Sequence, residues 1–152
     1  MLYFATVWTG LLFVCLSVGC WILGWMPDVG RFRQCDRLIA SAWLGLVALA
    51  ISFLLIAIFL PLSPGVGAIA ISGWLLISWK RRRVRDELIA WLRALPLWGW
   101  IFYGGCLLAI GLFSTQAITW IDTGLYHYGL IHWLARYGVT PGLALINRQF
   151  GF

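Results

Sequence analysis

Long apolar runs separated by short polar segments dominate the chain. The runs cover residues 2–25, 38–60, 62–79 and 97–113. A membrane-spanning helix needs about 20 mostly apolar residues. The third run is short, with 14 residues after the Pro-Gly turn or 18 counted from Leu62, and Lys80 at its end can extend outward toward the headgroups. Exposed strand edges are not tolerated in lipid. The pattern therefore predicts an all-α polytopic membrane bundle of about four transmembrane helices plus interfacial helices.

The first run differs from a cleavable signal peptide in two ways. It lacks a positively charged start, and it is longer than the usual apolar core of about 7–15 residues. We expect a retained helix that ends at Met26-Pro27-Asp28.

The polar segments predict the connections. Pro61-Leu62-Ser63-Pro64-Gly65 is typical of a tight turn. The strongest charge run is Lys80-Arg81-Arg82-Arg83-Val84-Arg85-Asp86-Glu87, and apolar positions follow it. This pattern indicates a short amphipathic interfacial helix near 84–95, which Pro96 separates from the last run.

Positive charge predicts the topology. The polar loop at 27–37 carries three Arg, and the segment at 80–87 carries five Lys or Arg. Four spans place both segments on one side, which should be the cytoplasm because positive loops resist translocation. We therefore expect a four-span region at 1–121 in the cell (inner or cytoplasmic) membrane. The N-terminus and an interfacial segment at 122–152 would be extracytoplasmic.

Composition narrows the class of protein. Hydrophobic residues make up 62% of the chain and charged residues 11%, against about 25% charged in soluble domains. A water-soluble globule and a disordered chain are both excluded. The net charge of +6 lies beside apolar runs, so the expected partner is the lipid bilayer and not nucleic acid. The predicted spans lack charged residues, which argues against a transporter.

Cysteines and small residues suggest structure more than chemistry. The four cysteines form no Cys-x-x-Cys pair, so we expect neither a metal site nor redox chemistry from them. Glycines scattered through the runs indicate close helix packing within one polypeptide rather than a dedicated dimer motif.

The segment after the fourth run holds the candidate chemistry. It contains both histidines, and Asp122 is the only acidic residue outside the segments expected to be cytoplasmic. On a helix over 124–136, Tyr128, His132 and Arg136 share one stripe at about 100° per residue. His127 lies about 140° from His132, so no zinc pair is expected.

Two interpretations of this segment remain open. The stripe could bind a phosphate through the bidentate guanidinium of Arg136. Alternatively, it could belong to an interfacial helix whose arginine contacts lipid phosphate. Asp122 could cap the helix, or it could act as a general base or hold a divalent cation. We expect no other cofactor.

A family resemblance favours the functional interpretation. The strings Asp122-Thr123-Gly124-Leu125-Tyr126-His127, Ile131-His132-Trp133 and Pro141-Gly142-Leu143, with Asn147, resemble a motif of large bacterial polytopic membrane proteins. Those proteins in turn resemble GT-C-type glycosyltransferases, which use polyprenyl-phosphate sugar donors. The resemblance covers most of the chain but is specific only at 122–152.

The resemblance implies roles for individual residues. Asp122 corresponds to the essential acidic residue of the first large external loop, and His127 lies beside it. With Tyr128, His132 and Arg136, His127 would contact a polyprenyl-phosphate-linked sugar. His132 stands where the family motif has Lys. Family members are several times longer, and this chain ends inside the motif, so we expect an N-terminal fragment that is inactive alone. The alternative is a small non-enzymatic membrane protein that associates with a partner through its helices.

Overall fold

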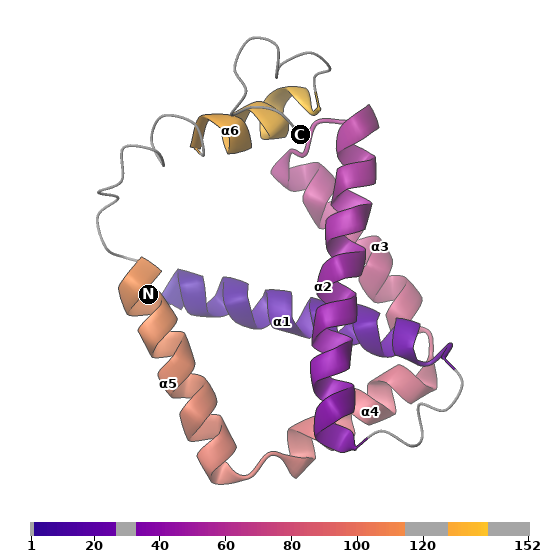
Figure 1. The fold of residues 1–152 in the computed structure, drawn as a ribbon, viewed down its shortest axis with the longest axis vertical. Coiled ribbons are helices and arrows are strands. Elements are labelled where there is room, and N and C mark those ends of the chain that lie inside the picture. Colours follow the sequence, from indigo (N-terminus) through magenta and orange to yellow (C-terminus); the bar gives the residue numbers. More distant parts are fainter. Residues whose placement is uncertain (1, 27–32, 115–127, 140–152) are drawn as a thin grey trace. The chain divides into compact units, whose positions relative to one another are not determined.

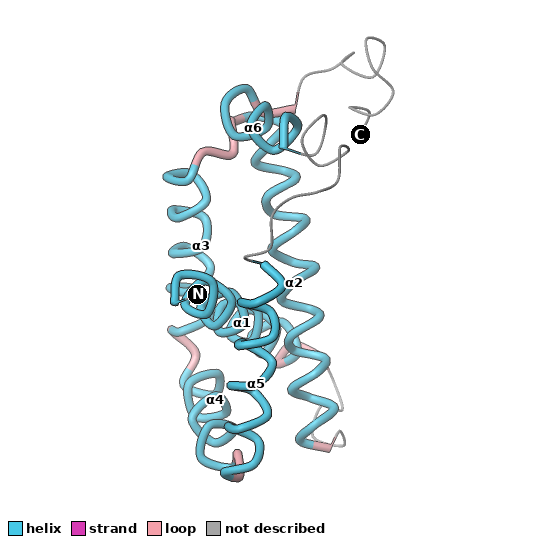
Figure 2. The backbone as a smooth tube through the Cα atoms, turned by 90° about the vertical axis from the view of Figure 1, so that its left-hand side faces the viewer, coloured by secondary structure: helices cyan, strands magenta, loops and turns pink. Residues whose placement is uncertain are grey.

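The computed structural model describes residues 2–26, 33–114 and 128–139. These residues form helices and short connections without a β-strand, which confirms the all-α prediction (Figures 1 and 2). The helices in chain order are α1 (Leu2–Leu23), α2 (Gln34–Phe59), α3 (Pro64–Trp79), α4 (Arg82–Ala94), α5 (Leu97–Ser114) and α6 (Tyr128–Tyr137).

Three described helices are long and apolar enough to cross a membrane. These are α1, α2 and α5, with 22, 26 and 18 residues. The fourth apolar run forms α3, which has 16 residues and is therefore about 24 Å long. That length is short of a hydrocarbon core of about 30 Å. The crossing of α3 stays a prediction.

Proline and serine set the start of α3. The predicted turn ends earlier than expected, because Pro64 is already the first helical residue. Proline suits this position, where its missing N–H costs nothing. The Ser63 hydroxyl accepts a hydrogen bond from the Val66 N–H at 3.4 Å, so Ser63 is the N-cap.

Two other helix boundaries also differ from the predicted ranges. α2 begins at Gln34, although residues 34–37 were expected in the polar loop. Gln and Arg are good helix formers, so the helix extends beyond its apolar run. α4 confirms an amphipathic helix and ends before Leu95, whose ψ of 116° is extended. A residue preceding proline, as Leu95 precedes Pro96, disfavours the helical conformation.

The chain divides into two compact units. The first comprises the described residues of 1–49 and 72–116, and the second those of 50–71 and 117–152. In the first unit α1 crosses α2 at small residues. A Cβ atom on Gly19 would overlap the backbone of Ser41, and one on Gly45 would overlap the backbone of Cys15. Two small residues four apart on each helix therefore let the backbones meet, as expected from the scattered glycines.

The first unit also contains a small apolar core. Val84, Leu88 and Trp91 form the buried face of α4 and pack around Cys20 of α1. Leu16, Trp21 and Leu38 cover the edge of this cluster. One face of α4 is therefore committed to protein, and its remaining faces are left for other contacts.

Candidate functional site

α6 carries three of the predicted site residues. Tyr128, His132 and Arg136 are exposed and four residues apart along this helix, so they lie on one face. The helix was expected from 124, but residues 124–127 lie outside the described part of the chain. Asp122 and His127 also lie outside it, and their closeness to Arg136 stays a prediction.

The guanidinium of Arg136 lies beside an aromatic pair. Its Cζ lies 5.6 Å from the ring centroid of Tyr137. That ring lies 4.7 Å from the ring of Trp133. Trp and Tyr prefer the membrane–water interface, and a cation in the last turn is favoured by the helix dipole. The arrangement suits a helix that presents a positive charge at the depth of phosphate groups.

Backbone hydrogen bonds hold α6 against the end of α2. The carbonyl of Ala57 would normally accept from the residue four positions later, but that residue is Pro61, which has no N–H. The Val139 N–H donates to this carbonyl instead, at 2.9 Å. In return the Leu62 N–H donates to the Leu134 carbonyl at 3.0 Å. The residue after α6 thus satisfies a carbonyl that α2 leaves open, and the Leu134 carbonyl accepts a bond from the connection that follows α2.

Gly138 makes this docking feasible. Its φ of 73° is left-handed, and its N–H donates to the Leu134 carbonyl at 3.1 Å, which closes the last turn of α6. A Cβ atom here would lie 2.9 Å from the carbonyl oxygen of Ala57. Glycine is therefore favoured both by the backbone conformation and by the close approach to α2.

A second polar cluster lies at the start of α2, and it was not predicted. Arg37 forms an ion pair with Glu87 of α4. The Cys20 thiol of α1 donates a hydrogen bond to Glu87 Oε2 at 3.3 Å. The Glu87 side chain is only 11% exposed. A signal was present, because Glu87 lies three residues after Val84 and four before Trp91, on the apolar side of α4.

This cluster borders a polar cavity of about 630 Å³. Gln34 and Arg37 of α2 line it together with Arg83, Asp86 and Glu87 of α4. Two arginines face two carboxylates, so the cavity wall has no net charge. The cluster is better suited to joining α1, α2 and α4 than to binding a charged ligand.

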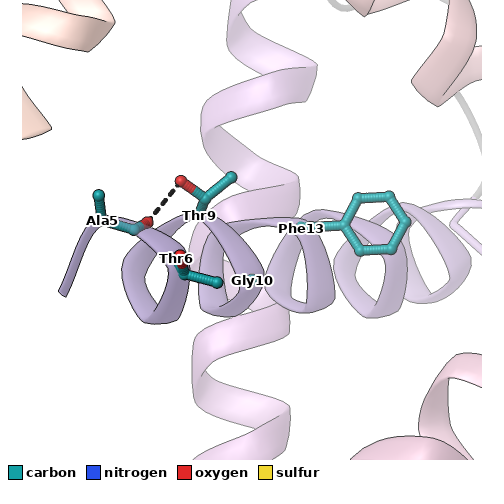
Figure 3. Close-up of a pocket in the computed structure, with 5 residues that line it drawn as sticks. All are labelled: Ala5, Thr6, Thr9, Gly10 and Phe13. Atoms are coloured by element: carbon teal, nitrogen blue, oxygen red, sulfur yellow. Dashed lines mark hydrogen bonds between the residues drawn. The ribbon is translucent and has the colours of Figure 1, made fainter. Parts of the chain in front are cut away.

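A third candidate is an open groove of about 550 Å³ on α1 (Figure 3). Ala5, Thr6, Thr9, Gly10 and Phe13 line it. The Thr9 hydroxyl donates to the Ala5 carbonyl at 2.7 Å and accepts from the Tyr103 hydroxyl at 2.9 Å. These five lining residues carry no ionisable group, so the groove offers packing surface and no acid–base chemistry.

No three metal-ligating side chains come together within the described ranges. This finding does not test the prediction of a divalent cation at Asp122, because Asp122 lies outside the described ranges.

A family model described as "Domain of unknown function (DUF8201)" matches residues 1–152. No curated protein and no solved structure matches the chain.

Proposed function

The chain belongs to the DUF8201 family, and we propose that it is a membrane part of a GT-C-like glycosyltransferase. In this proposal the segment 122–152 handles a polyprenyl-phosphate-linked sugar at the extracytoplasmic face of the cell membrane. The observation that carries the proposal is the position of α6. Its C-terminal end is bonded through the backbone to the end of α2, a candidate membrane span. Tyr128, His132 and Arg136 are exposed on one face of α6. The motif resemblance at 122–152 supports the same function.

The distribution of positive charge supports the proposed topology. The two basic segments meet in the first unit, where Arg37 pairs with Glu87. The positive-inside rule favours the cytoplasm for these segments. With four spans, the segment 122–152 would then be extracytoplasmic.

The chemistry assigns a role to each candidate. The guanidinium of Arg136 would bind the donor phosphate through charge-assisted hydrogen bonds, with His132 and Tyr128 beside it. Asp122 would accept the proton of an acceptor hydroxyl, or hold a divalent cation against the phosphate. The acceptor oxygen then bonds to the anomeric carbon, and the bond from that carbon to the phosphate oxygen breaks. Polyprenyl phosphate and the glycosylated acceptor are the products.

The resembling enzymes enclose the lipid-linked substrate with additional helices. From this chain alone we therefore expect binding of a polyprenyl phosphate rather than turnover. His127 would contribute to the same contact next to Asp122.

Binding of polyprenyl phosphate by the chain in nanodiscs tests the proposal. Arg136→Ala should weaken binding at least about tenfold, because a hydrogen bond to a charged group is worth about 1.5–3 kcal/mol and about 1.4 kcal/mol is tenfold in affinity. Arg33→Ala is the matched control, since Arg33 is also exposed but lies just before α2, outside α6. Equal binding by the wild-type chain and both variants would exclude the phosphate role of Arg136.

The carboxylate is tested separately in a longer family member. Asp122→Asn keeps the capping ability of the side chain but removes its charge. A loss of glycan product with normal membrane insertion supports catalysis. Unchanged product supports a capping role only.

A second candidate function has its own observation. The groove on α1 is lined by small and apolar side chains, as expected of a surface on which a partner helix packs. If polyprenyl phosphate does not bind, association with a partner in the membrane becomes the favoured function.

A further inference from the structure

α4 is held at the membrane surface from both of its ends. Only residues 80–81 separate it from α3, and only residues 95–96 separate it from α5. Helix ends separated by two residues are three Cα steps apart, which is at most about 11 Å. α3 and α5 are both apolar helices. A basic helix tethered this closely to two apolar helices stays at their ends.

Tryptophans near both ends of α4 indicate its depth in the membrane. The guanidinium of Arg81, just before α4, lies 4.0 Å from the ring centroid of Trp25 and 5.5 Å from that of Trp21. Just after α4, Trp98 is 72% exposed at the start of α5. Tryptophan concentrates at the headgroup level of bilayers. Both ends of α4 are therefore at the interface between hydrocarbon and water.

α4 has a second apolar side in addition to its buried one. Ile89 and Leu92 are 44% and 52% exposed. At about 100° per residue they share an arc of about 100° with three arginines. We call this surface the basic face of α4, and it consists of Arg82, Arg85, Ile89, Leu92 and Arg93. Exposed Asp86 borders this face about 20° beyond Arg93, so three arginines outnumber one carboxylate there. The face lies away from Val84, Leu88 and Trp91, which are packed against α1.

We propose that the basic face of α4 binds the headgroups of anionic phospholipids in the adjacent leaflet. Ile89 and Leu92 enter the acyl boundary, and Arg82, Arg85 and Arg93 contact lipid phosphates at headgroup depth. Mixed arginine and aliphatic side chains are what an in-plane helix uses on an anionic membrane. The positive charge of this face complements the phosphates of the lipid headgroups at the same depth, so we take anionic lipid as the occupant. The proposed glycosyltransferase function is not required, because this surface is formed by α4 and not by α6.

The test measures which lipids the protein retains. The full chain is reconstituted in mixed phosphatidylcholine and phosphatidylglycerol bilayers and extracted gently, and its bound lipids are quantified by mass spectrometry. We expect phosphatidylglycerol to be enriched over its bulk fraction, and the enrichment to fall at high salt. Each arginine neutralised should lower the relative affinity about fivefold. The triple variant Arg82→Gln, Arg85→Gln, Arg93→Gln should lose the enrichment.

Matched variants separate the basic face from general positive charge. Arg33→Gln, Arg83→Gln removes two charges from positions off the face and should keep the enrichment. Arg82→Gln, Arg85→Gln removes two charges from the face and should reduce it. Arg82→Lys, Arg85→Lys, Arg93→Lys keeps the charge on the face and should keep the enrichment. Equal loss in the two double Gln variants, or no enrichment by the wild-type chain, would overturn the proposal.

Discussion

The two ends of α2 are held by different kinds of contact. At its start, side chains make the contact, with Arg37 of α2 paired to Glu87 of α4. At its end, main-chain atoms make them, through Ala57 and Val139. The first end therefore depends on which side chains are present. The second depends on backbone geometry, so the docking bonds leave the side chains of α6 available for a ligand.

The largest expected effect is at the helix crossing in the first unit. Gly19→Ala places a methyl group where the Ser41 carbonyl lies, so the two helices must separate. Overpacking of this kind costs about 1–3 kcal/mol, and we expect the upper part of that range because backbone cannot rotate away. Thermal unfolding in detergent, followed by circular dichroism, measures the loss. Gly10→Ala on the same helix meets nothing within 4 Å and should unfold no earlier than wild type.

The ion pair gives the next largest effect. Glu87→Gln leaves the Arg37 charge without its carboxylate in a mostly buried place. We expect a loss of about 2 kcal/mol, since leaving a buried charged group unsatisfied is costly. Chemical unfolding in mixed micelles gives the free energy. Asp86→Asn is the control, because Asp86 is exposed and should change stability by less than about 0.5 kcal/mol. A similar loss in both variants would mean that net charge, not the pair, matters.

How far the sequence predicts this structure differs between features. The apolar runs indicated all four apolar helices, since about 20 apolar residues have few other stable states in lipid. The amphipathic pattern indicated α4. The place of Glu87 on the apolar side of α4 was a signal that its side chain is buried. The pattern did not indicate Arg37 as its partner, because that depends on how α2 packs on α4.

Long-range contacts were the part that sequence could not provide. The meeting of Gly19 with Ser41 depends on which faces of two uniformly apolar helices turn toward each other, and uniform hydrophobicity carries no such information. The docking of α6 depends on the N–H that Pro61 lacks and on Val139, which is 78 residues further along. The stripe of Tyr128, His132 and Arg136 was predictable because it needs only helical spacing.

A smaller effect is expected at the docking of α6. Gly138→Ala strains a left-handed residue by about 1–2 kcal/mol and brings a methyl group to the Ala57 carbonyl. The amides of Leu62 and Val139 should then exchange with deuterium faster, while the first unit keeps its protection. Gly129→Ala is the matched control on α6, because its surroundings are open and alanine favours a helix by about 1 kcal/mol. Unchanged exchange in Gly138→Ala would refute the backbone docking.

The smallest effect concerns Arg81. It separates two roles of the arginines at the start of α4, which are packing on tryptophan rings and binding of lipid headgroups. Its guanidinium lies over Trp25 and Trp21, so Arg81→Gln should lower stability by about 0.5–1 kcal/mol through the lost cation–π contacts. Tryptophan fluorescence during thermal unfolding reports on these rings. Arg82→Gln, one residue further, removes the same charge from an exposed position on the basic face of α4. We expect it to leave the unfolding midpoint unchanged and to reduce phosphatidylglycerol retention. Because the two substitutions should affect different measurements, a shared response would show that this segment acts through its total charge alone.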